Sequence, residues 1–418
     1  MVPNGWKLTS LGEVCSGKLQ TGPFGSQLHA HEYTDEGVPV LMPKDLISFR
    51  SNHESAAKIP AHRADDLKKH ILMSGDLLFS RRGDVSRFAL IESDLPKSLC
   101  GTGCLKATPN QEHSPLFLSY FLQKNAVKKW LEQNAVGQTM PNMNTAILSE
   151  LPLMVASCRE EEDKIAKILS KWDKAISTTE KLIETSKQQK KALMQQLLTG
   201  KRRLVDPETG KVFEGDWEEV HIGDICEVNP KKLPEPCNEL VSFIPMDAVS
   251  EDAKLLRTEV RKYIDVSKGF TSFKDSDTLI AKITPCFENG KGAKVDGLEN
   301  GVGFGSTEFH VLRAKKGICP DFIYFITNTS AFRVRGEINM QGSAGQKRVT
   351  TDYLKLYTMV VPKELKEQQK IASVLTTADK EIEVFKAKLA HFKQEKKALM
   401  QQLLTGKRRV KVEEMEVA

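Results

Sequence analysis

Two long stretches of the chain carry hydrophobic residues at alternating spacings of four and three, which is the pattern of a coiled-coil helix. Lys, Glu and Gln are frequent at the positions between them, as expected of a solvated helix face. The pattern therefore predicts two helices of more than four heptads each. Their predicted seam residues are Ile165, Leu169, Trp172, Ile176, Ile183, Leu193, Leu197, Ile371, Leu375, Ala378, Ile382, Phe385, Leu389, Phe392, Leu399 and Leu403.

The seams also contain polar positions, namely Thr179, Ser186 and Lys190 in the first helix and Lys396 in the second. Neither helix is therefore expected to be stable alone. We predict that the two helices pack on each other within one chain and run antiparallel, since that arrangement gives an approximate two-fold axis. The alternative is that each helix pairs with another subunit.

An internal repeat supports this interpretation. The sequence KKALMQQLLTGKRR begins at Lys190 and again, identical over 14 residues, at Lys396. Both copies end at Thr-Gly, where Gly200 and Gly406 can adopt the left-handed conformation that commonly ends a helix. A weaker repeat relates the regions that precede the helices, for example Tyr120-Phe121 and Tyr324-Phe325. The sequence thus indicates a tandem duplication with the order domain, helix, domain, helix.

The regions before each helix show short hydrophobic runs typical of strands, such as Leu77–Phe79, Phe243–Pro245 and Phe309–Leu312, and helical stretches at Phe117–Lys129 and Phe322–Asn328. No regular alternation of strand and helix is visible, so the sequence predicts an α+β fold with two mixed α/β domains. The predicted boundaries are a first domain at 1–155, a helix at 156–200, a linker at 201–213, a second domain at 214–361, a helix at 362–406 and a charged tail at 407–418.

The charge is unevenly distributed along the chain. The net charge is +6, yet residues 1–150 carry 16 basic and 15 acidic side chains and residues 211–360 carry 20 and 22. The basic excess lies in the helical segments. This distribution excludes indiscriminate coating of polyanions, and a nucleic acid would have to bind through a local basic surface.

The chain shows no recognisable catalytic motif: we find no Walker A sequence, no H-E-x-x-H and no G-x-S-x-G. The eight cysteines form no C-x-x-C pair, so we expect free thiols in a reducing compartment and no metal site. No signal peptide and no apolar stretch of membrane-spanning length is visible, which predicts a cytoplasmic protein. The sequence indicates a device for binding and positioning, not an enzyme.

The repeated Q-x-x-[KA]-A-L-M-Q-Q-L-L-T-G, the D-x-x-I stretch in each helix and the linker L-x-D-P-E-T-G-K resemble the specificity subunit of type I restriction–modification systems. The resemblance covers nearly the whole chain. It implies that each globular part is a target recognition domain that reads one half of a split, asymmetric double-stranded DNA site. It further implies that the paired helices fix the unread spacer.

The same resemblance implies that two modification subunits, which bind S-adenosylmethionine, dock on this chain and methylate adenine at N6. Restriction subunits would add an ATP- and Mg-dependent translocase and nuclease. No cofactor is expected on this chain itself. Two alternatives remain: a coiled-coil adaptor without sequence-specific DNA reading, and a single-chain DNA methyltransferase or nuclease with degenerate motifs.

Arg and Lys can bond guanine O6 and N7, and Gln can bond adenine N6 and N7. Candidate DNA contacts are therefore basic and Gln residues in probable loops of the two domains. Gly137-Gln138 and Gly345-Gln346 are interpreted as matching steps. The candidates are Lys44, Arg81, Arg82, Arg87 and Gln138 in the first domain and Lys282, Lys291, Lys294, Gln346, Lys347 and Arg348 in the second.

Overall fold

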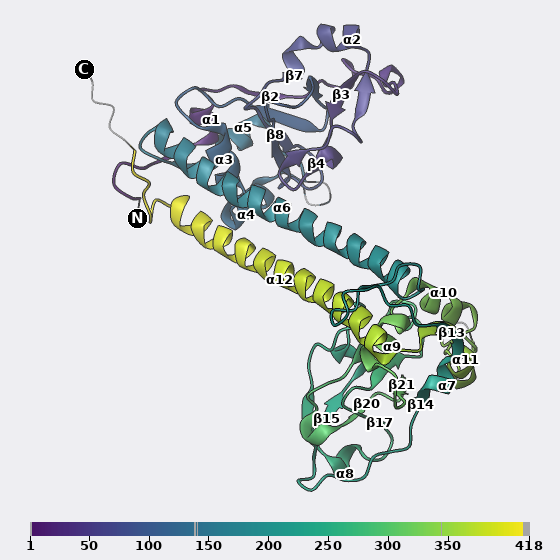
Figure 1. Cartoon of the computed structure of the whole chain (residues 1–418). Coiled ribbons are helices and arrows are strands. Elements are labelled where there is room, and N and C mark those ends of the chain that lie inside the picture. Colours follow the sequence, from purple (N-terminus) through teal and green to yellow (C-terminus); the bar gives the residue numbers. More distant parts are fainter. Residues whose placement is uncertain (1, 138, 140, 344, 413–418) are drawn as a thin grey trace. The chain divides into compact units, whose positions relative to one another are not determined.

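The computed structural model describes residues 2–137, 139, 141–343 and 345–412. The chain divides into two units, one made of Met1–Thr179 with Lys388–Ala418 and the other of Glu180–Ala387. Each unit contains one globular domain and a segment from each of two long helices, α6 (Arg159–Leu197) and α12 (Leu365–Leu403), drawn in teal and yellow in Figure 1. The α+β prediction is confirmed in both units.

The first globular domain contains three sheets among its described residues. The small sheet pairs β1 (Lys7–Ser10) with β12 (Pro152–Val155). The second sheet has the order β6 (Ala57–Ile59), β3 (Val38–Leu41), β10 (Ser98–Cys100) and β7 (Ile71–Leu72). The third has the order β2 (Leu19–Thr21), β11 (Cys104–Ala107), β8 (Leu77–Ser80), β9 (Phe88–Leu90), β5 (Arg50–Ser51) and β4 (Leu46–Ile47).

The helices of this domain are short. They are α1 (Leu11–Val14), α2 (Ala61–Asp66), α3 (Pro115–Leu122), α4 (Asn125–Asn134) and α5 (Thr145–Ser149). The helical stretch predicted over Phe117–Lys129 is confirmed but divided into two helices, because Lys124 has an extended backbone (φ −67°, ψ 138°) that separates α3 from α4. The break lets the apolar α3 lie in the core while α4 exposes its polar face.

The second globular domain repeats this topology within the part of the chain that the structure describes. The small sheet pairs β13 (Trp217–His221) with β22 (Thr358–Pro362). One four-stranded sheet has the order β16 (Glu259–Lys262), β15 (Leu240–Ile244), β20 (Val302–Gly305) and β17 (Thr271–Lys274). The other has the order β14 (Cys226–Val228), β21 (Phe309–Ala314), β18 (Thr278–Ala281) and β19 (Gly292–Lys294).

The pairing directions repeat as well. β3 runs parallel to β10 and antiparallel to β6, as β15 runs parallel to β20 and antiparallel to β16. The helices of this domain are α7 (Ile222–Ile225), α8 (Tyr263–Val266), α9 (Pro320–Thr327), α10 (Ser330–Ile338) and α11 (Thr351–Leu356). The two domains are therefore copies of one fold, and the predicted duplication is confirmed.

In the first unit, the beginning of α6 lies against the end of α12. Trp172 and Phe392 make an edge-to-face contact with ring centroids 5.6 Å apart. Ile165 and Leu169 share one hydrophobic core with Leu403 and with the first globular domain. Here the two helix segments run antiparallel, and their outer ends are anchored in the domain core as well as in each other.

In the second unit, the end of α6 lies against the beginning of α12. Met194 and Leu197 share a core with Ile371, Leu375 and the second globular domain. This confirms antiparallel pairing within one chain, and the alternative of pairing with another subunit is not needed to bury the seam. All of the predicted seam residues are buried or half-buried.

Matched polar contacts accompany the hydrophobic seam. Lys190 Nζ donates to Asp379 Oδ1 at 2.6 Å in the second unit, and Lys396 Nζ donates to Asp173 Oδ1 at 2.6 Å in the first. Each residue of one pair lies 206 positions from its counterpart in the other, the offset of the sequence repeat. The charges of Lys190 and Lys396, two of the polar positions in the seams, are thus neutralised by an aspartate of the opposite helix.

The residues after each helix fold back in the same way. Gly200 (φ 69°) and Gly406 (φ 64°) have the left-handed backbone that the sequence predicts. Just beyond them, Arg203 makes two hydrogen bonds of 2.6 and 2.8 Å to Glu367. Arg409 makes two of 2.6 and 2.9 Å to Glu161. One arginine of each basic cluster therefore stabilises the start of the opposite helix.

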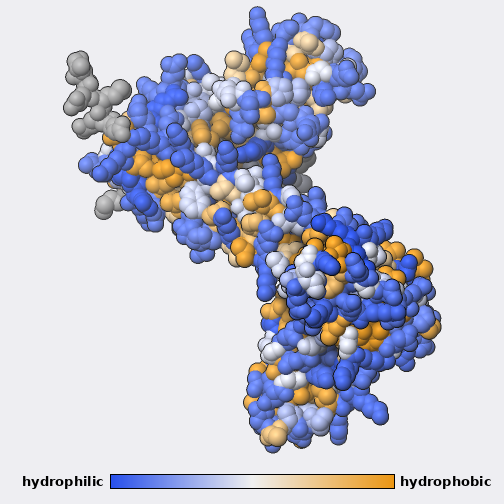
Figure 2. Space-filling view, in the orientation of Figure 1, coloured by the Kyte–Doolittle hydropathy of each residue, from blue (hydrophilic) through white to orange (hydrophobic). Residues whose placement is uncertain are grey.

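The drawn face of each unit is mostly hydrophilic, with hydrophobic residues in separate patches (Figure 2). Single exposed hydrophobic side chains include Ile264 and Ile338, each 76% exposed. None of the described helices is long and apolar enough to cross a membrane.

Candidate nucleic-acid interface

A hairpin after α4 pairs with the end of strand β8 in the first domain. Val136 and Asn142 exchange two backbone hydrogen bonds of 2.9 and 2.8 Å, which close the hairpin. The hairpin then joins the chain beyond β8, since Met143 N donates to Arg81 O at 2.8 Å. A bridge between Arg82 and Asn142 completes the contact. The base of the hairpin is thereby held beside Arg81 and Arg82.

The second domain contains the same construction after α10. Gln341 and Arg348 exchange backbone hydrogen bonds of 2.9 and 2.8 Å. Val349 N donates to Lys282 O at 2.8 Å, and Ile283 forms the bridge with Arg348. These bonds make Arg81 equivalent to Lys282, Arg82 to Ile283 and Asn142 to Arg348. We call each of these arrangements, residues 81–83 with 136–143 and residues 282–284 with 341–349, the hairpin site of its domain.

The hairpins differ in length by one residue. Five positions separate Val136 from Asn142, and six separate Gln341 from Arg348. Gly137 (φ 100°) follows the first closing residue as Gly342 (φ 129°) follows the second. The prediction that Gly137-Gln138 matches Gly345-Gln346 is therefore wrong, because Gly137 corresponds to Gly342. The candidate Gln138 itself lies outside the described residues.

The basic side chain of the second hairpin site is held in place by an acid. Arg348 Nε donates to Glu308 Oε2 at 3.0 Å, and its Nη2 donates to Oε1 at 2.9 Å. The guanidinium holds the pKa of Glu308 below its ordinary value, and the carboxylate raises that of Arg348. Arg348 nevertheless keeps 43% of its side chain exposed. Gln346 and Lys347 beside it are exposed.

The structure brings together only some of the candidates predicted from the sequence. Lys282, Gln346, Lys347 and Arg348 gather at the second hairpin site, and Arg81 and Arg82 at the first. Arg87 and Lys291 lie next to the hairpin sites by their backbone, since Arg87 O accepts from Ser80 N at 2.9 Å and Lys291 O from Ala281 N at 3.0 Å. The Arg87 side chain pairs with Asp84 at 3.1 Å. The other two candidates lie elsewhere: Lys44 on a short 3-10 helix (Pro43–Asp45), and Lys294 paired with Asp296 and Asp321.

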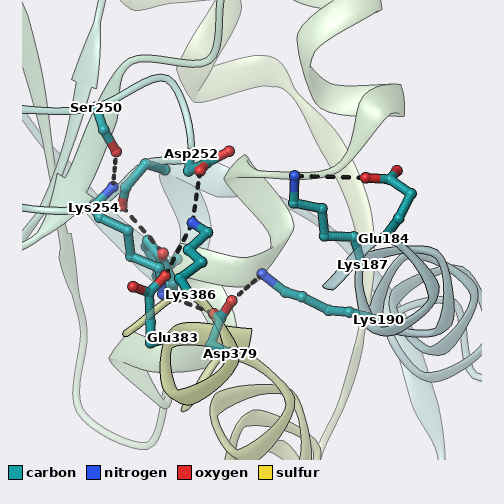
Figure 3. Close-up of polar contacts among 11 residues, drawn as sticks. Glu184, Lys187, Lys190, Ser250, Asp252, Lys254, Asp379, Glu383 and Lys386 are labelled. Carbon is teal, nitrogen blue, oxygen red and sulfur yellow. Dashed lines mark hydrogen bonds and ion pairs between the residues drawn. The ribbon is translucent and has the colours of Figure 1, made fainter. Parts of the chain in front are cut away.

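Lys294 belongs to a second polar region, where the second domain meets α12 within the second unit. Lys190 and Lys254 both point toward Asp379 there, the latter at 2.9 Å, while Lys386 pairs with Asp252 and Glu383 (Figure 3). An open cavity of about 580 Å³ adjoins this region. Its acids and lysines neutralise one another, so the geometry is that of a structural ion-pair network.

Sequence reasoning missed Glu308 and Asn142. Asn142 can bond adenine as Gln does but was not among the candidates, and Glu308, whose type suggests no guanine contact, lies 40 positions before its partner Arg348. The available signal was indirect: in both domains a segment that contains glycine, Gly137 or Gly342, lies between a short helix and a helix N-cap. No cluster of three or more metal-ligating side chains occurs in the described ranges.

The cysteines of the chain are free thiols. Burial raises the pKa of Cys15, Cys100 and Cys226 to about 12, with nearby charges contributing less. Cys237 is exposed. The buried thiols thus act as small hydrophobic side chains, as the sequence suggested.

The fold and its two matched sites define a duplicated protein in which a recognition module and a long helix alternate twice. The family model described as "Type I restriction modification DNA specificity domain" matches residues 3–187 and again 214–394. The chain therefore belongs to this family, and each domain–helix half is one copy of the family domain.

Similar proteins carry related descriptions. The type I restriction enzyme EcoAI specificity subunit of Escherichia coli is 41% identical over 169 residues, 39% of this chain and 28% of that protein. The match thus spans about a quarter of that relative's length. A putative type I restriction enzyme MjaX specificity subunit of Methanocaldococcus jannaschii is 25% identical over 98% of this chain and 95% of its own.

Among solved structures, the type I restriction–modification S subunit of M. genitalium has a TM-score of 0.57 at 14% identity, with 96% of this chain and 97% of that chain covered. The structural likeness extends over both domains and both helices, so the whole architecture, and not one domain alone, is shared.

Proposed function

We propose that this chain is the DNA sequence-specificity subunit of a type I restriction–modification complex. Each target recognition domain reads one half of an asymmetric, split site in double-stranded DNA. The paired helices set the spacer between the halves and dock the modification subunits. Family membership over both halves of the chain supports this proposal.

The observation that carries the proposal is the pair of hairpin sites. The same backbone hydrogen bonds hold both, yet their side chains differ: Arg82 and Asn142 form one bridge, Ile283 and Arg348 the other. Two identical readers would select a palindrome, whereas two unlike readers on a common frame select an asymmetric site. Arginine at one position of each bridge suits guanine in the major groove.

Catalysis is assigned to partners. Two modification subunits would bind S-adenosylmethionine and methylate adenine at N6, and restriction subunits would supply the ATP- and Mg-dependent translocase and nuclease. This chain would position those enzymes on DNA and bind no cofactor itself. Its expected place is the cytoplasm, where the DNA and these subunits are found.

The test is a nuclease-protection and methylation experiment. The chain is purified with the modification subunits of its host, and the methylated adenines of the host genome are mapped. We expect protection of one discontinuous site and methylation at a single split motif. Exchange of residues 1–155 for the corresponding domain of another family member should change one half of the motif and leave the other intact.

Other outcomes would favour the alternatives. If the complex assembles but protects no discontinuous site, the chain is an adaptor that does not read DNA. If the isolated chain transfers methyl groups to DNA or cuts it, the chain is itself a methyltransferase or nuclease. Either result would contradict the proposal.

A further inference from the structure

We infer that Arg348 reads a guanine in the half-site of the second domain, and that Glu308 is the positioning residue that aims it. This inference rests on the proposed function, because it specifies which base that domain reads and through which side chain.

An arginine side chain carries five N–H donors in a fixed planar arrangement. Glu308 accepts from Nε and from one N–H of Nη2. Nη1 donates one N–H to the backbone oxygen of Gln346 at 3.2 Å. One N–H on Nη1 and one on Nη2 then remain, with no acceptor among the residues that the structure describes. Two such adjacent donors are what bonding to guanine O6 and N7 requires.

The carboxylate also removes the flexibility that a long side chain otherwise has. Arg348 is fixed at its backbone by the exchange of hydrogen bonds with Gln341, and at its guanidinium by Glu308. A side chain held at both ends loses little further conformational entropy when it binds a base. An exposed arginine paired with a glutamate adds little to folding stability, so the pair is better explained by orientation of the arginine than by stability.

The first hairpin site differs at this position. Asn142 occupies the place of Arg348, and Gly103 occupies the place of Glu308, because Arg81 N donates to Gly103 O as Lys282 N donates to Glu308 O. The first domain therefore has neither the reading residue nor the residue that aims it. The guanine contact through Arg348 belongs to the second half of the recognition site alone.

The experiment uses the complex of the full chain with its modification subunits and measures methylation of a DNA library in which every position of the site is randomised. The variants are Arg348→Ala, Arg348→Lys and Glu308→Gln. The matched control is Arg261→Ala, which removes another exposed arginine paired with a glutamate, Glu259, on the edge strand β16 of the same domain.

We expect Arg348→Ala to reduce the preference for guanine at one position of one half-site by about 10- to 100-fold and to leave the other half unchanged. Arg348→Lys should reduce that preference by a smaller factor while keeping overall binding, because a lysine can still bond guanine but lacks the two fixed, parallel donors of the guanidinium. Glu308→Gln should relax the same position by a smaller factor. Arg261→Ala should leave every base preference unchanged.

The inference is overturned if Arg348→Lys leaves all base preferences intact, if the variants weaken methylation of all sequences equally, or if no guanine position relaxes. These results differ from failure of the proposed function, in which the wild-type complex itself shows no split motif and the inference falls with it. Thermal unfolding of each variant shows whether it still folds. If Arg348→Ala does not fold, the base preferences of Arg348→Lys, which keeps the charge, test whether Arg348 reads a guanine.

Discussion

Asp379 on α12 accepts a hydrogen bond from Lys190 of α6 at 2.6 Å and also pairs with Lys254 of the second domain at 2.9 Å. One carboxylate thus connects the two helices to each other and to the globular domain of the same unit. Its counterpart Asp173 accepts from Lys396 at 2.6 Å and from the Tyr120 hydroxyl at 2.6 Å. Both units use an aspartate in this role, with different domain partners.

Substitution of the aspartate should cost more stability than substitution of one lysine. Asp379→Leu leaves Lys190 and Lys254 without their shared partner, and we expect a loss of about 2–4 kcal/mol, since an uncompensated charge remains in a mostly buried place. Lys190→Met leaves Asp379 paired with Lys254 and should cost about 1 kcal/mol. Urea unfolding of the full chain measures both values, and a larger loss for Lys190→Met would contradict this account.

Replacement by lysine should destabilise the chain more at Arg203, which bonds Glu367, than at Arg409, which bonds Glu161. Glu367 is 1% exposed and receives two hydrogen bonds from Arg203, which a lysine cannot reproduce. We expect Arg203→Lys to cost about 1–2 kcal/mol. Arg409→Lys should cost less, because the Arg409 side chain is 43% exposed and solvent screens its interaction with Glu161. Denaturation midpoints of the two variants, compared under one set of conditions, test the order.

Burial of His310 should make folding sensitive to mild acid. Desolvation lowers the pKa of His310, which contacts Val349 O at 2.8 Å and the side chain of Asn229. The neutral ring is favoured in the folded state, so the unfolded chain binds the proton more readily, and stability falls as the pH drops below about 6.5. His310→Gln removes this group, and its stability should decline less between pH 6.5 and pH 5 than that of the wild type.

The prediction for His310 can be contradicted by the pH dependence of the variant's stability. His53 and His70 also have lowered pKa values through burial, so the variant should keep part of the acid sensitivity. An identical slope for wild type and His310→Gln would show that His310 is accessible to protons in the folded state.

Thiol labelling should distinguish one cysteine from the buried ones. With a pKa of about 12, the thiols of Cys15, Cys100 and Cys226 are ionised to only about one part in ten thousand at pH 8. Iodoacetamide should therefore modify exposed Cys237 in the native chain and these three only after denaturation. Mass spectrometry of tryptic peptides reports each site. Equal labelling of Cys15 and Cys237 in native buffer would contradict the described core.

The long helices could be predicted because the spacing of hydrophobic residues along one segment is enough to specify a helix. A stripe at spacings of four and three over Ile371 to Leu403 specifies a helix whatever surrounds it, and an identical stretch elsewhere implies its partner. The periodicity predicts only a helix seam at the ends of that stripe, whereas Ile371 and Leu375 also pack into the second domain. A hydrophobic periodicity shows which face is buried but not what covers it.

The sheets and the hairpin sites could not be predicted to the same depth. Strands such as β10 are only three residues long and fully buried, so they lack the alternation that marks a half-exposed strand. The contact between Glu308 and Arg348 depends on a fold that joins segments 40 positions apart. Basic side chains could be listed from the sequence, but their division into gathered and isolated residues required the backbone hydrogen bonds.

Each hairpin is closed by a pair of backbone hydrogen bonds, between Val136 and Asn142 in the first domain and between Gln341 and Arg348 in the second. Between those bonds, Pro141 and Lys347 accept backbone hydrogen bonds from Gly83 and Thr284, and the two copies differ in length there by one residue. The two copies show that this fold accepts a change of one residue in the hairpin. Insertion or deletion of a codon there is therefore a route by which a lineage could change base preference while keeping the rest of the domain.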